Sequence, residues 1–327
     1  MLQVAKIREN KEAYLKALEK RNFDATELFS EVLRLDEERR STQATLDEIL
    51  AESNKLSREI PLMFKSGEHM KADLLKEKSA GLKVRSKELS GKLNQVSADL
   101  QQQLYNLPNI PNELVPAGAS EADNQEVFSE GEIPQLHEGA LPHWELAKKY
   151  DIIDFELGNK ITGAGFPVYK GKGARLQRAL ITYFLDKSTQ AGYTEFQMPL
   201  MVNEASGIGT GQLPDKEGQM YHVQQDDLYL IPTSEVPITN MFRDSLLEEK
   251  DFPIKCTGYT PCFRREAGSY GADVRGLNRL HQFDKVELVR IEKPEDSYAA
   301  LDEMVEHVKE LLRDLGLPYR ILRLCGG

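Results

Sequence analysis

The chain has 327 residues, of which 40% are hydrophobic and 29% are charged, and its formal net charge is −11. This length allows two domains, while the negative charge argues against a protein that coats nucleic acid without selectivity. The sequence has no stretch of about 18 uncharged apolar residues, no apolar signal core at its N-terminus and no CxxC pair among its three cysteines, so we expect a cytoplasmic protein with no membrane contact, no disulfide and no zinc site.

A heptad pattern dominates the N-terminal third of the chain. One or two short helices over residues 1–26 precede it. From residue 28 the seam positions alternate in steps of three and four residues: Leu28, Val32, Leu35, Arg39, Thr42, Leu46, Ile49, Ser53, Leu56 and Ile60. Pro61 and the run Lys65-Ser66-Gly67 interrupt this pattern, and a second seam returns over residues 75–100. The pattern predicts an antiparallel helical hairpin whose helices, of about 33 residues each, make an arm about 50 Å long.

The charge of this arm is uneven. Residues 71–92 hold seven basic residues against three acidic ones. A local basic stripe on an acidic protein suits a selective contact with a polyanion. The heptads alone favour a dimerising or spacer coiled coil, so both interpretations remain open at this point.

Proline-rich and then acidic residues over 106–124 indicate a domain boundary. Further on, residues 170–176 combine glycines with lysines, but they lack the GxxxxGK[ST] spacing of a phosphate loop. We interpret them as the start of an amphipathic helix over 174–191. A strand over 192–202 follows and is broken by Pro199, a position typical of a sheet edge or an interface.

Polar residues follow the next predicted strand. Residues 207–211 are predicted as a glycine-rich loop, and the apolar run 228–232 then leads into Thr233-Ser234-Glu235. A helix over 293–313 and a strand over 319–324 are predicted at the end of the chain. Polar residues at a strand end are common, so this signal is weak by itself.

The most informative stretch is a predicted β-hairpin over residues 259–290. Side chains alternate along a strand, so Arg264 and Glu266 share one face of the first arm. On the return arm, residues 277–288, the side chains on one face are Arg279, His281, Phe283, Lys285 and Glu287. Arginine can bind phosphate, an aromatic ring can stack on a base, and a carboxylate can hold an ammonium group. A solvated sheet face with salt bridges is the alternative.

The order of these residues closely resembles motif 2 of class II aminoacyl-tRNA synthetases, in the form of the bacterial seryl-tRNA synthetase family. The matching residues are Phe263, Arg264 and Glu266, then a glycine-rich loop, then Arg279, His281, Gln282, Phe283, Lys285 and Glu287. The helix, strand and proline over 174–202 resemble motif 1, and the arm resembles the family's tRNA-binding hairpin. The run Pro142-His143-Trp144-Glu145-Leu146 extends the resemblance, which runs essentially end to end.

The resemblance implies an α+β fold, with an N-terminal antiparallel α-helical coiled-coil hairpin and a class II synthetase domain built on an antiparallel β-sheet flanked by helices. Residues 1–105 would form the tRNA-binding arm, 106–140 a linker and 141–327 part of the catalytic domain. Family members continue with more sheet, a magnesium-holding segment and motif 3. We therefore expect a chain truncated before motif 3, with an incomplete sheet, that does not activate serine by itself.

The implied function is serine–tRNA ligase: ATP-dependent activation of L-serine to seryl-adenylate and transfer of serine to tRNA(Ser). ATP is a substrate, Mg²⁺ is the implied cofactor with no ligand assigned in this chain, and motif 1 implies a homodimer. Arg264 and Glu266 are the predicted catalytic residues, on the α-phosphate and the adenine respectively. The resemblance completes the ATP site with Arg265, Arg279, Leu280 and Phe283.

The resemblance assigns the L-serine pocket to Thr233, Ser234, Glu235 and Glu287, with Glu287 on the ammonium group. His281 and Lys285 are interpreted as neighbours on the same face. Asp273, Val274 and Arg275 fall in the motif 2 loop, which in the family moves between ATP and the acceptor end of tRNA.

Two other hypotheses remain. A catalytically inactive, synthetase-like RNA-binding paralogue would keep the arm without the chemistry, and the missing third motif favours it. A carrier-protein aminoacylating ligase would share the catalytic fold, but such enzymes lack a long arm with a heptad seam.

Overall fold

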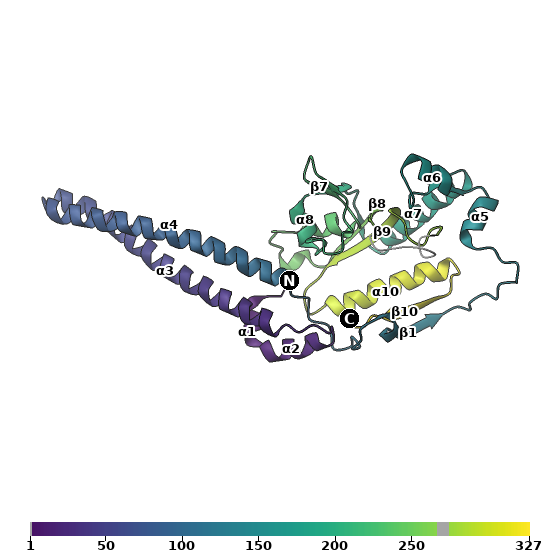
Figure 1. Cartoon of the computed structure of the whole chain (residues 1–327), viewed down its shortest axis with the longest axis horizontal. Helices are drawn as coiled ribbons and strands as arrows, with labels where there is room; N and C mark the ends of the chain where they lie inside the picture. Colours follow the sequence, from purple (N-terminus) through teal and green to yellow (C-terminus); the bar gives the residue numbers. More distant parts are fainter. Residues whose placement is uncertain (1, 267–274) are drawn as a thin grey trace. The chain divides into compact units, whose positions relative to one another are not determined.

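The computed structural model describes residues 2–266 and 275–327, which divide into two compact units. One unit comprises Met1–Glu130 with Arg320–Gly327, and the other comprises Gly131–Tyr319 (Figure 1). Within the described residues, no helix combines the length and apolar character needed to cross a bilayer.

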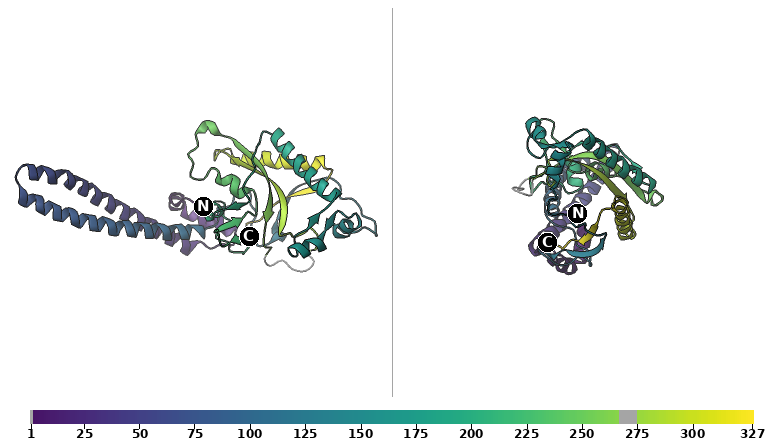
Figure 2. Two further views of the ribbon diagram at one scale, coloured as in Figure 1. Left: turned by 90° about the horizontal axis from the view of Figure 1, so that it is seen from above. Right: turned by 90° about the vertical axis from the view of Figure 1, so that its right-hand side faces the viewer.

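Two long antiparallel helices, α3 (Thr26–Lys65) and α4 (His69–Tyr105), form the arm of the first unit (Figure 2). The predicted seam is confirmed, because its positions are buried or half-buried while most of their neighbours are exposed. The helices have 40 and 37 residues, longer than expected. The predicted break at Pro61 is wrong, because α3 continues to Lys65. Pro61 removes one helical hydrogen bond, to the carbonyl of Ser57, and since only four residues follow it in the helix, this loss falls near the helix end.

Two short helices, α1 (Val4–Glu9) and α2 (Lys11–Glu19), pack at the root of the arm. The apolar core there consists of Ile7, Leu18, Ala25, Phe29, Val32, Leu35, Val96, Leu100, Leu104 and Leu107. Burying this surface is what holds α1 and α2 against the coiled coil.

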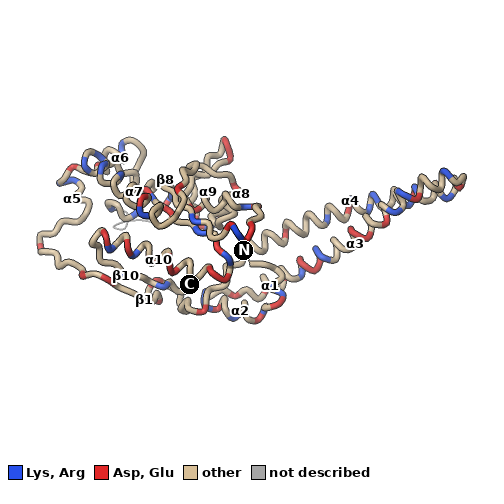
Figure 3. Tube along the Cα trace, turned by 180° about the vertical axis from the view of Figure 1, so that it is seen from behind, with Lys and Arg blue, Asp and Glu red and all other residues tan. Residues whose placement is uncertain are grey.

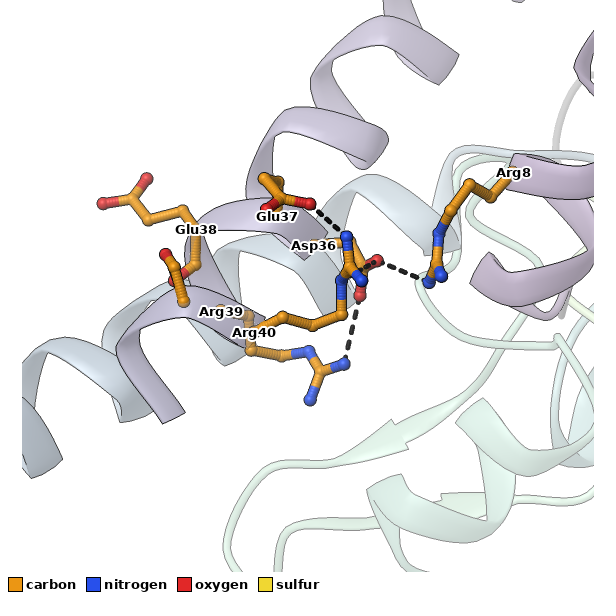
Figure 4. Close-up of polar contacts among 7 residues, drawn as sticks. Arg8, Asp36, Glu37, Glu38, Arg39 and Arg40 are labelled. Carbon is orange, nitrogen blue, oxygen red and sulfur yellow. Dashed lines mark hydrogen bonds and ion pairs between the residues drawn. The ribbon is translucent and has the colours of Figure 1, made fainter. Parts of the chain in front are cut away.

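A buried carboxylate lies beside this core (Figure 4). Asp36 is 2% exposed and is surrounded by Arg8 Nη2 at 2.8 Å, Arg39 Nη2 at 3.0 Å and Arg40 Nε at 3.3 Å. A buried charge is tolerated only when it is paired, and here three guanidinium groups supply the pairing. Arg8 comes from α1, so the cluster also ties α1 to α3.

The rest of the first unit is a short pair of strands, β1 (Gln125–Glu130) and β10 (Tyr319–Arg323), after the 3-10 turn η1 (Glu121–Asp123). The backbone N–H of Cys325 donates to Asn124 Oδ1 at 2.9 Å, which fixes the chain just beyond β10.

The second unit is built on a three-stranded sheet in the order β4 (Thr194–Glu195), β8 (Ile254–Phe263), β9 (Gln282–Ile291). The β8–β9 pair is antiparallel over ten residues, from Ile254 opposite Ile291 to Phe263 opposite Gln282, whereas β4 runs parallel to β8. Helix α7 (Lys172–Gln190) packs on β8 and β9. Helix α10 (Ser297–Asp314) lies beside α7, where Tyr183 donates to Asp314 at 3.1 Å.

A second small sheet has the order β5 (Met201–Val202), β7 (Leu228–Leu230), β6 (His222–Val223). Helix α8 (Glu204–Gly209) follows β5 in the chain, and helix α9 (Glu235–Asn240) follows β7. The remaining elements are α5 (His143–Lys149), the strands β2 (Ile153–Asp154) and β3 (Val168–Tyr169), α6 (Phe155–Ile161) and the 3-10 turn η2 (Glu249–Asp251).

The predicted glycine-rich loop over 207–211 is wrong at its start, because Gly207 and Gly209 lie in α8. A Cβ on Gly207 would come 2.7 Å from Leu213 Cδ1, and one on Gly209 would come 2.5 Å from Asn240 Oδ1. These glycines therefore allow close packing of a helix and are not there to form a loop.

The predicted return arm is also wrong at its start: the strand begins at Gln282, not at 277. The backbone N–H of Leu277 donates to His143 and that of His281 donates to Gly165. These two N–H groups therefore do not take part in the hydrogen bonds between β8 and β9. Arg279 and His281 therefore lie before β9, and the alternation of the strand does not place their side chains.

Candidate active site on strands β8 and β9

The register of β8 and β9 places a row of polar and aromatic side chains on one face of the sheet. Phe283 lies opposite Cys262, Lys285 opposite Thr260 and Glu287 opposite Gly258. The face with Tyr259 and Asp284 is turned the other way, where Tyr259 donates to Asp284 at 2.7 Å. The predicted alternation is therefore present from Phe283 onward.

Two of these side chains, Lys285 and Glu287, form a compact cluster with Thr233, which follows β7. Thr233 Oγ1 donates to Glu287 Oε2 at 2.6 Å, Lys285 Nζ donates to Thr233 Oγ1 at 3.1 Å, and Lys285 Nζ lies 2.6 Å from Glu287 Oε2. Thr233 is 3% exposed, and the Glu287 side chain is 17% exposed. Charge-assisted bonds in such a place are strong, so Thr233, Lys285 and Glu287 form a fixed polar cluster where the resemblance places the L-serine pocket.

The neighbours of Thr233 differ in accessibility. Ser234 is fully buried, and its hydroxyl lies 2.6 Å from that of Thr260. Ser234 therefore connects the segment after β7 to β8 and does not face solvent. Glu235 is exposed, yet loss of water around its carboxylate and then the charge of Glu287 raise its pKa, while Lys285 acts in the opposite direction.

At the other end of the face lie Arg264 and Phe283. The guanidinium carbon of Arg264 is 5.2 Å from the centre of the Phe283 ring, a cation–π distance. The backbone N–H of Arg264 donates to the His281 carbonyl at 3.0 Å, and that of Arg265 donates to the Gln219 carbonyl at 2.9 Å. An arginine and an aromatic ring are thus held side by side, a combination that suits a phosphate and a base.

The remaining predicted residues gather just beyond β8. Glu266 has a positive φ of 47°, which is unfavourable for a residue with a side chain, and its carboxylate lies 3.3 Å from Arg279 Nη1. Leu280 is 8% exposed. Asp273 and Val274 lie outside the described residues, whereas Arg275 is described and stacks on Trp144, with 4.8 Å from its guanidinium carbon to the ring centre.

Sequence reasoning missed two partners in this site. Lys285, interpreted as a neighbour, bonds directly to both Thr233 and Glu287. Thr260 faces Ser234 from β8, and its alternation with Cys262 was the only signal that could have found it. Among residues 2–266 and 275–327, no group of three or more His, Cys, Asp and Glu side chains gathers as metal ligands do.

The basic stripe on the arm lies along the outer half of α4 (Figure 3). Much of its charge is matched by acids of the arm itself, in the pairs Lys71–Glu68, Lys76–Asp73, Lys78–Glu52, Arg85–Glu88 and Lys92–Glu38. Exposed pairs of this kind contribute little to stability, so the lysines can exchange partners at little cost.

Comparisons with known proteins agree with both parts of this description. Residues 1–111 match the seryl-tRNA synthetase N-terminal domain, and residues 221–327 match the tRNA synthetase class II core domain (G, H, P, S and T). The chain is 45% identical to the serine–tRNA ligase of Salinibacter ruber over 327 residues, which is 100% of this chain and 76% of that relative.

Two solved structures are similar over the whole chain. Seryl-tRNA synthetase from Pyrococcus horikoshii complexed with ATP has a TM-score of 0.88 and 32% identity, with 100% of this chain and 77% of that chain covered. Cytoplasmic serine–tRNA ligase from Naegleria fowleri in complex with AMP has a TM-score of 0.83 and 26% identity, with 100% and 78% covered.

The polar face of β8 and β9 and the core-domain match define a class II aminoacyl-tRNA synthetase. The arm indicates which kind of class II synthetase this is, because residues 1–111 match the seryl-tRNA synthetase N-terminal domain. With 45% identity over its full length, the chain belongs to the seryl-tRNA synthetase family, and its function by this relationship is that of a serine–tRNA ligase. The predicted family, fold class and function are confirmed.

Proposed function

We propose that the β8–β9 face binds L-serine at one end and ATP at the other, and that it joins them as seryl-adenylate. The observation that carries this proposal is the register, which puts Glu287 and Lys285 on the same face as Phe283, with Arg264 over the ring. The serine carboxylate would attack the α-phosphorus of ATP, forming the acyl–phosphate bond and releasing pyrophosphate. No protein nucleophile is needed, so catalysis rests on positioning and charge.

The serine end is assigned to Thr233, Glu235 and Glu287. The Glu287 carboxylate accepts hydrogen bonds from the ammonium group of serine. Thr233 donates to the Glu287 carboxylate at 2.6 Å and so holds it in place. Lys285 already shares Glu287 Oε2, so serine binding requires a rearrangement of charges at this oxygen. Ser234 supports the pocket through Thr260.

The nucleotide end is assigned to Arg264, Arg265, Glu266, Arg279 and Phe283, with Leu280 beneath the nucleotide. Arg264 binds the α-phosphate and the serine carboxylate, Phe283 stacks the base and Glu266 meets the adenine. Arg279 reaches the outer phosphates. The similarity to a synthetase crystallised with ATP supports this half of the site.

Magnesium is the implied cofactor. Mg²⁺ prefers phosphate and carboxylate oxygens and would neutralise phosphate charge when bound. The described residues offer no cluster of ligands for it, so we assign no residue of this chain to the metal and route no step through it.

The partners follow from the remaining elements. The exposed lysines of α4 are proposed to contact the phosphates of tRNA(Ser), whose terminal ribose hydroxyl takes the seryl group from the adenylate, and the loop containing Arg275 is proposed to meet the acceptor end. A homodimer through motif 1 is supported by exposed apolar side chains of Leu176, Leu200 and Met201. Residues 1–105 as arm, 106–140 as linker and 141–327 as catalytic domain remain our proposed division.

The test is serine-dependent ATP–pyrophosphate exchange by the full-length gene product. Arg264→Ala should lower exchange by at least about 10²-fold, because it removes a preorganised donor to a developing oxyanion. The matched control is Arg21→Ala, an exposed arginine of the first unit, which should leave exchange unchanged. Equal activity in the two variants would remove the basis of the proposal, and no exchange by the unmutated product would favour an inactive paralogue.

A further inference from the structure

Residues 275–281, here called the return segment, lead from the motif 2 loop into β9, and their first end is attached to α5. The backbone N–H of Leu277 donates to Nε2 of His143 at 2.7 Å, and the guanidinium carbon of Arg275 lies 4.8 Å from the centre of the Trp144 ring. A ring nitrogen that accepts from a backbone N–H carries no proton. The contact with Leu277 therefore uses Nε2 as the acceptor nitrogen of the ring.

Gly276 shows how closely the two parts fit. Its φ is +71°, and a Cβ built on it would lie 2.1 Å from Nε2 of His143. A side chain at this position would thus be strained by the backbone and would displace the imidazole from Leu277. The glycine is there because the return segment passes directly against the ring.

The second end of the return segment is attached at His281. Its backbone N–H donates to the Gly165 carbonyl at 2.9 Å, and its ring stacks on Phe166 with centres 5.3 Å apart and planes 16° apart. Nδ1 of the same ring lies 2.7 Å from the hydroxyl oxygen of Tyr221. A Cβ on Gly165 would come 2.3 Å from the ring of His281, so this contact is close as well.

Arg279 is the middle residue between these two attachments, two positions from each. Its side chain is 56% exposed and its one described ion partner is Glu266, at 3.3 Å. A long exposed side chain gains little order from its own contacts. Its reach is therefore set by where the backbone places its Cα.

We propose that His143 and Phe166 are positioning residues of the synthetase: they hold the return segment at its two ends and thereby present Arg279 to the outer phosphates of ATP. This inference rests on the proposed role of Arg279 in ATP binding. It gives a function to His143 and Phe166, which lie before motif 1 and are not among the residues assigned above to ATP or serine.

Loss of one attachment should lower kcat/KM for ATP and leave the KM for serine nearly unchanged. A displacement of about 1 Å in a catalytic group can lower rate by roughly 10²-fold, and with the His281 attachment intact we expect part of this effect. The serine pocket depends on Thr233, Lys285 and Glu287, none of which contacts the return segment in the bonds described above. A general loss of folding would change both substrates together.

The kinetic test is pyrophosphate exchange by the full-length gene product with ATP and serine varied separately. His143→Ala should lower kcat/KM for ATP by about tenfold or more and leave the KM for serine within about twofold. His143→Gln should restore most of the loss, because its amide oxygen can accept from Leu277. The matched control is His137→Ala, an exposed histidine whose ring accepts from the backbone N–H of Gly139, two residues further along the chain.

The structural test is hydrogen exchange of the Leu277 amide in the 327-residue chain, which does not depend on activity. His143→Ala should increase its exchange rate by at least about tenfold, whereas His137→Ala should not change it. If His143→Ala does not fold, Gly276→Ala removes the same bond from the other side and carries the same expectations.

The outcomes separate this inference from the proposed function. If Arg279→Ala lowers kcat/KM for ATP while His143→Ala behaves as His137→Ala, the positioning role is wrong and the ATP site stands. If Arg279→Ala has no effect, the assignment of Arg279 fails and the inference is overturned with it. Unchanged amide exchange at Leu277 in His143→Ala would overturn the attachment itself.

Discussion

Replacement of Thr233 by valine tests the serine pocket with almost no change of shape. The hydroxyl of Thr233 donates to Glu287 Oε2 at 2.6 Å and accepts from Lys285 Nζ at 3.1 Å and from the backbone N–H of Glu235 at 3.2 Å. The residue is 3% exposed, so water cannot replace these bonds freely. Valine keeps the volume and removes all three contacts, which makes the substitution chemically non-conservative.

The expected effect follows from the bond to the carboxylate. A hydrogen bond to a charged group contributes about 1.5–3 kcal/mol, which corresponds to about a 10- to 150-fold rise in the KM for serine if Glu287 loses its orientation. The KM for ATP should stay within about twofold, since Arg264 and Phe283 are untouched. Pyrophosphate exchange by the full-length gene product measures both constants.

Two further variants complete the test of Thr233. Thr233→Ser keeps the hydroxyl and should stay near wild type. Thr182→Val removes an exposed hydroxyl that donates to the carbonyl of Arg178 within α7, and it should change neither KM. A serine KM within twofold of wild type in Thr233→Val would refute the assignment of this pocket.

Three other predictions follow from the described contacts. Asp36→Ala should lower the free energy of unfolding by about 1–3 kcal/mol. This is less than the roughly 3–5 kcal/mol of a broken buried pair, because the arginine partners of Asp36 are 39–44% exposed and regain water. Urea unfolding followed by circular dichroism measures the loss, and a value below about 0.5 kcal/mol would contradict this prediction. The pKa of Glu235 is raised above its ordinary 4.5, so ionisation of Glu235 weakens the fold as pH rises above that value. Glu235→Gln should therefore raise the Tm near neutral pH and lose this advantage as pH falls towards 4.5; a Tm shift that does not depend on pH would contradict this prediction. Lys83→Ala with Lys87→Ala should weaken binding of tRNA(Ser) and make it less salt-dependent by up to about two in the log–log slope, whereas Lys16→Ala in α2 should do neither.

The arm and the central hairpin could be predicted from the sequence because both are periodic. The heptad seam requires one side of each helix to be apolar, and residues as unlike as Arg39 and Leu46 are half-buried or buried at its positions. The two-residue period of β9 likewise placed Phe283 and Glu287 on one face. Period determines which side of an element is buried, and this information is local.

The details that failed depend on contacts between distant segments. The glycines of α8 are explained by Leu213 and Asn240, which no local pattern reveals. The return segment leaves the β ladder because His143, 134 positions away, accepts its N–H. Lys285 bonds to Thr233, which follows β7 and lies outside the hairpin. Neither secondary-structure propensity nor the alternation of side chains along a strand predicts these contacts between separate segments.

The central claim is that one sheet face is divided between an amino-acid end and a nucleotide end. Equilibrium binding of serine and of a non-hydrolysable ATP analogue to two variants of the full-length gene product tests it most directly. Glu287→Gln should weaken serine binding by about tenfold or more and keep ATP-analogue binding within twofold, and Arg264→Ala should weaken ATP-analogue binding by at least about tenfold. If Glu287→Gln loses the ATP analogue as strongly as serine, or if Arg264→Ala binds the ATP analogue normally, the division of the face is contradicted.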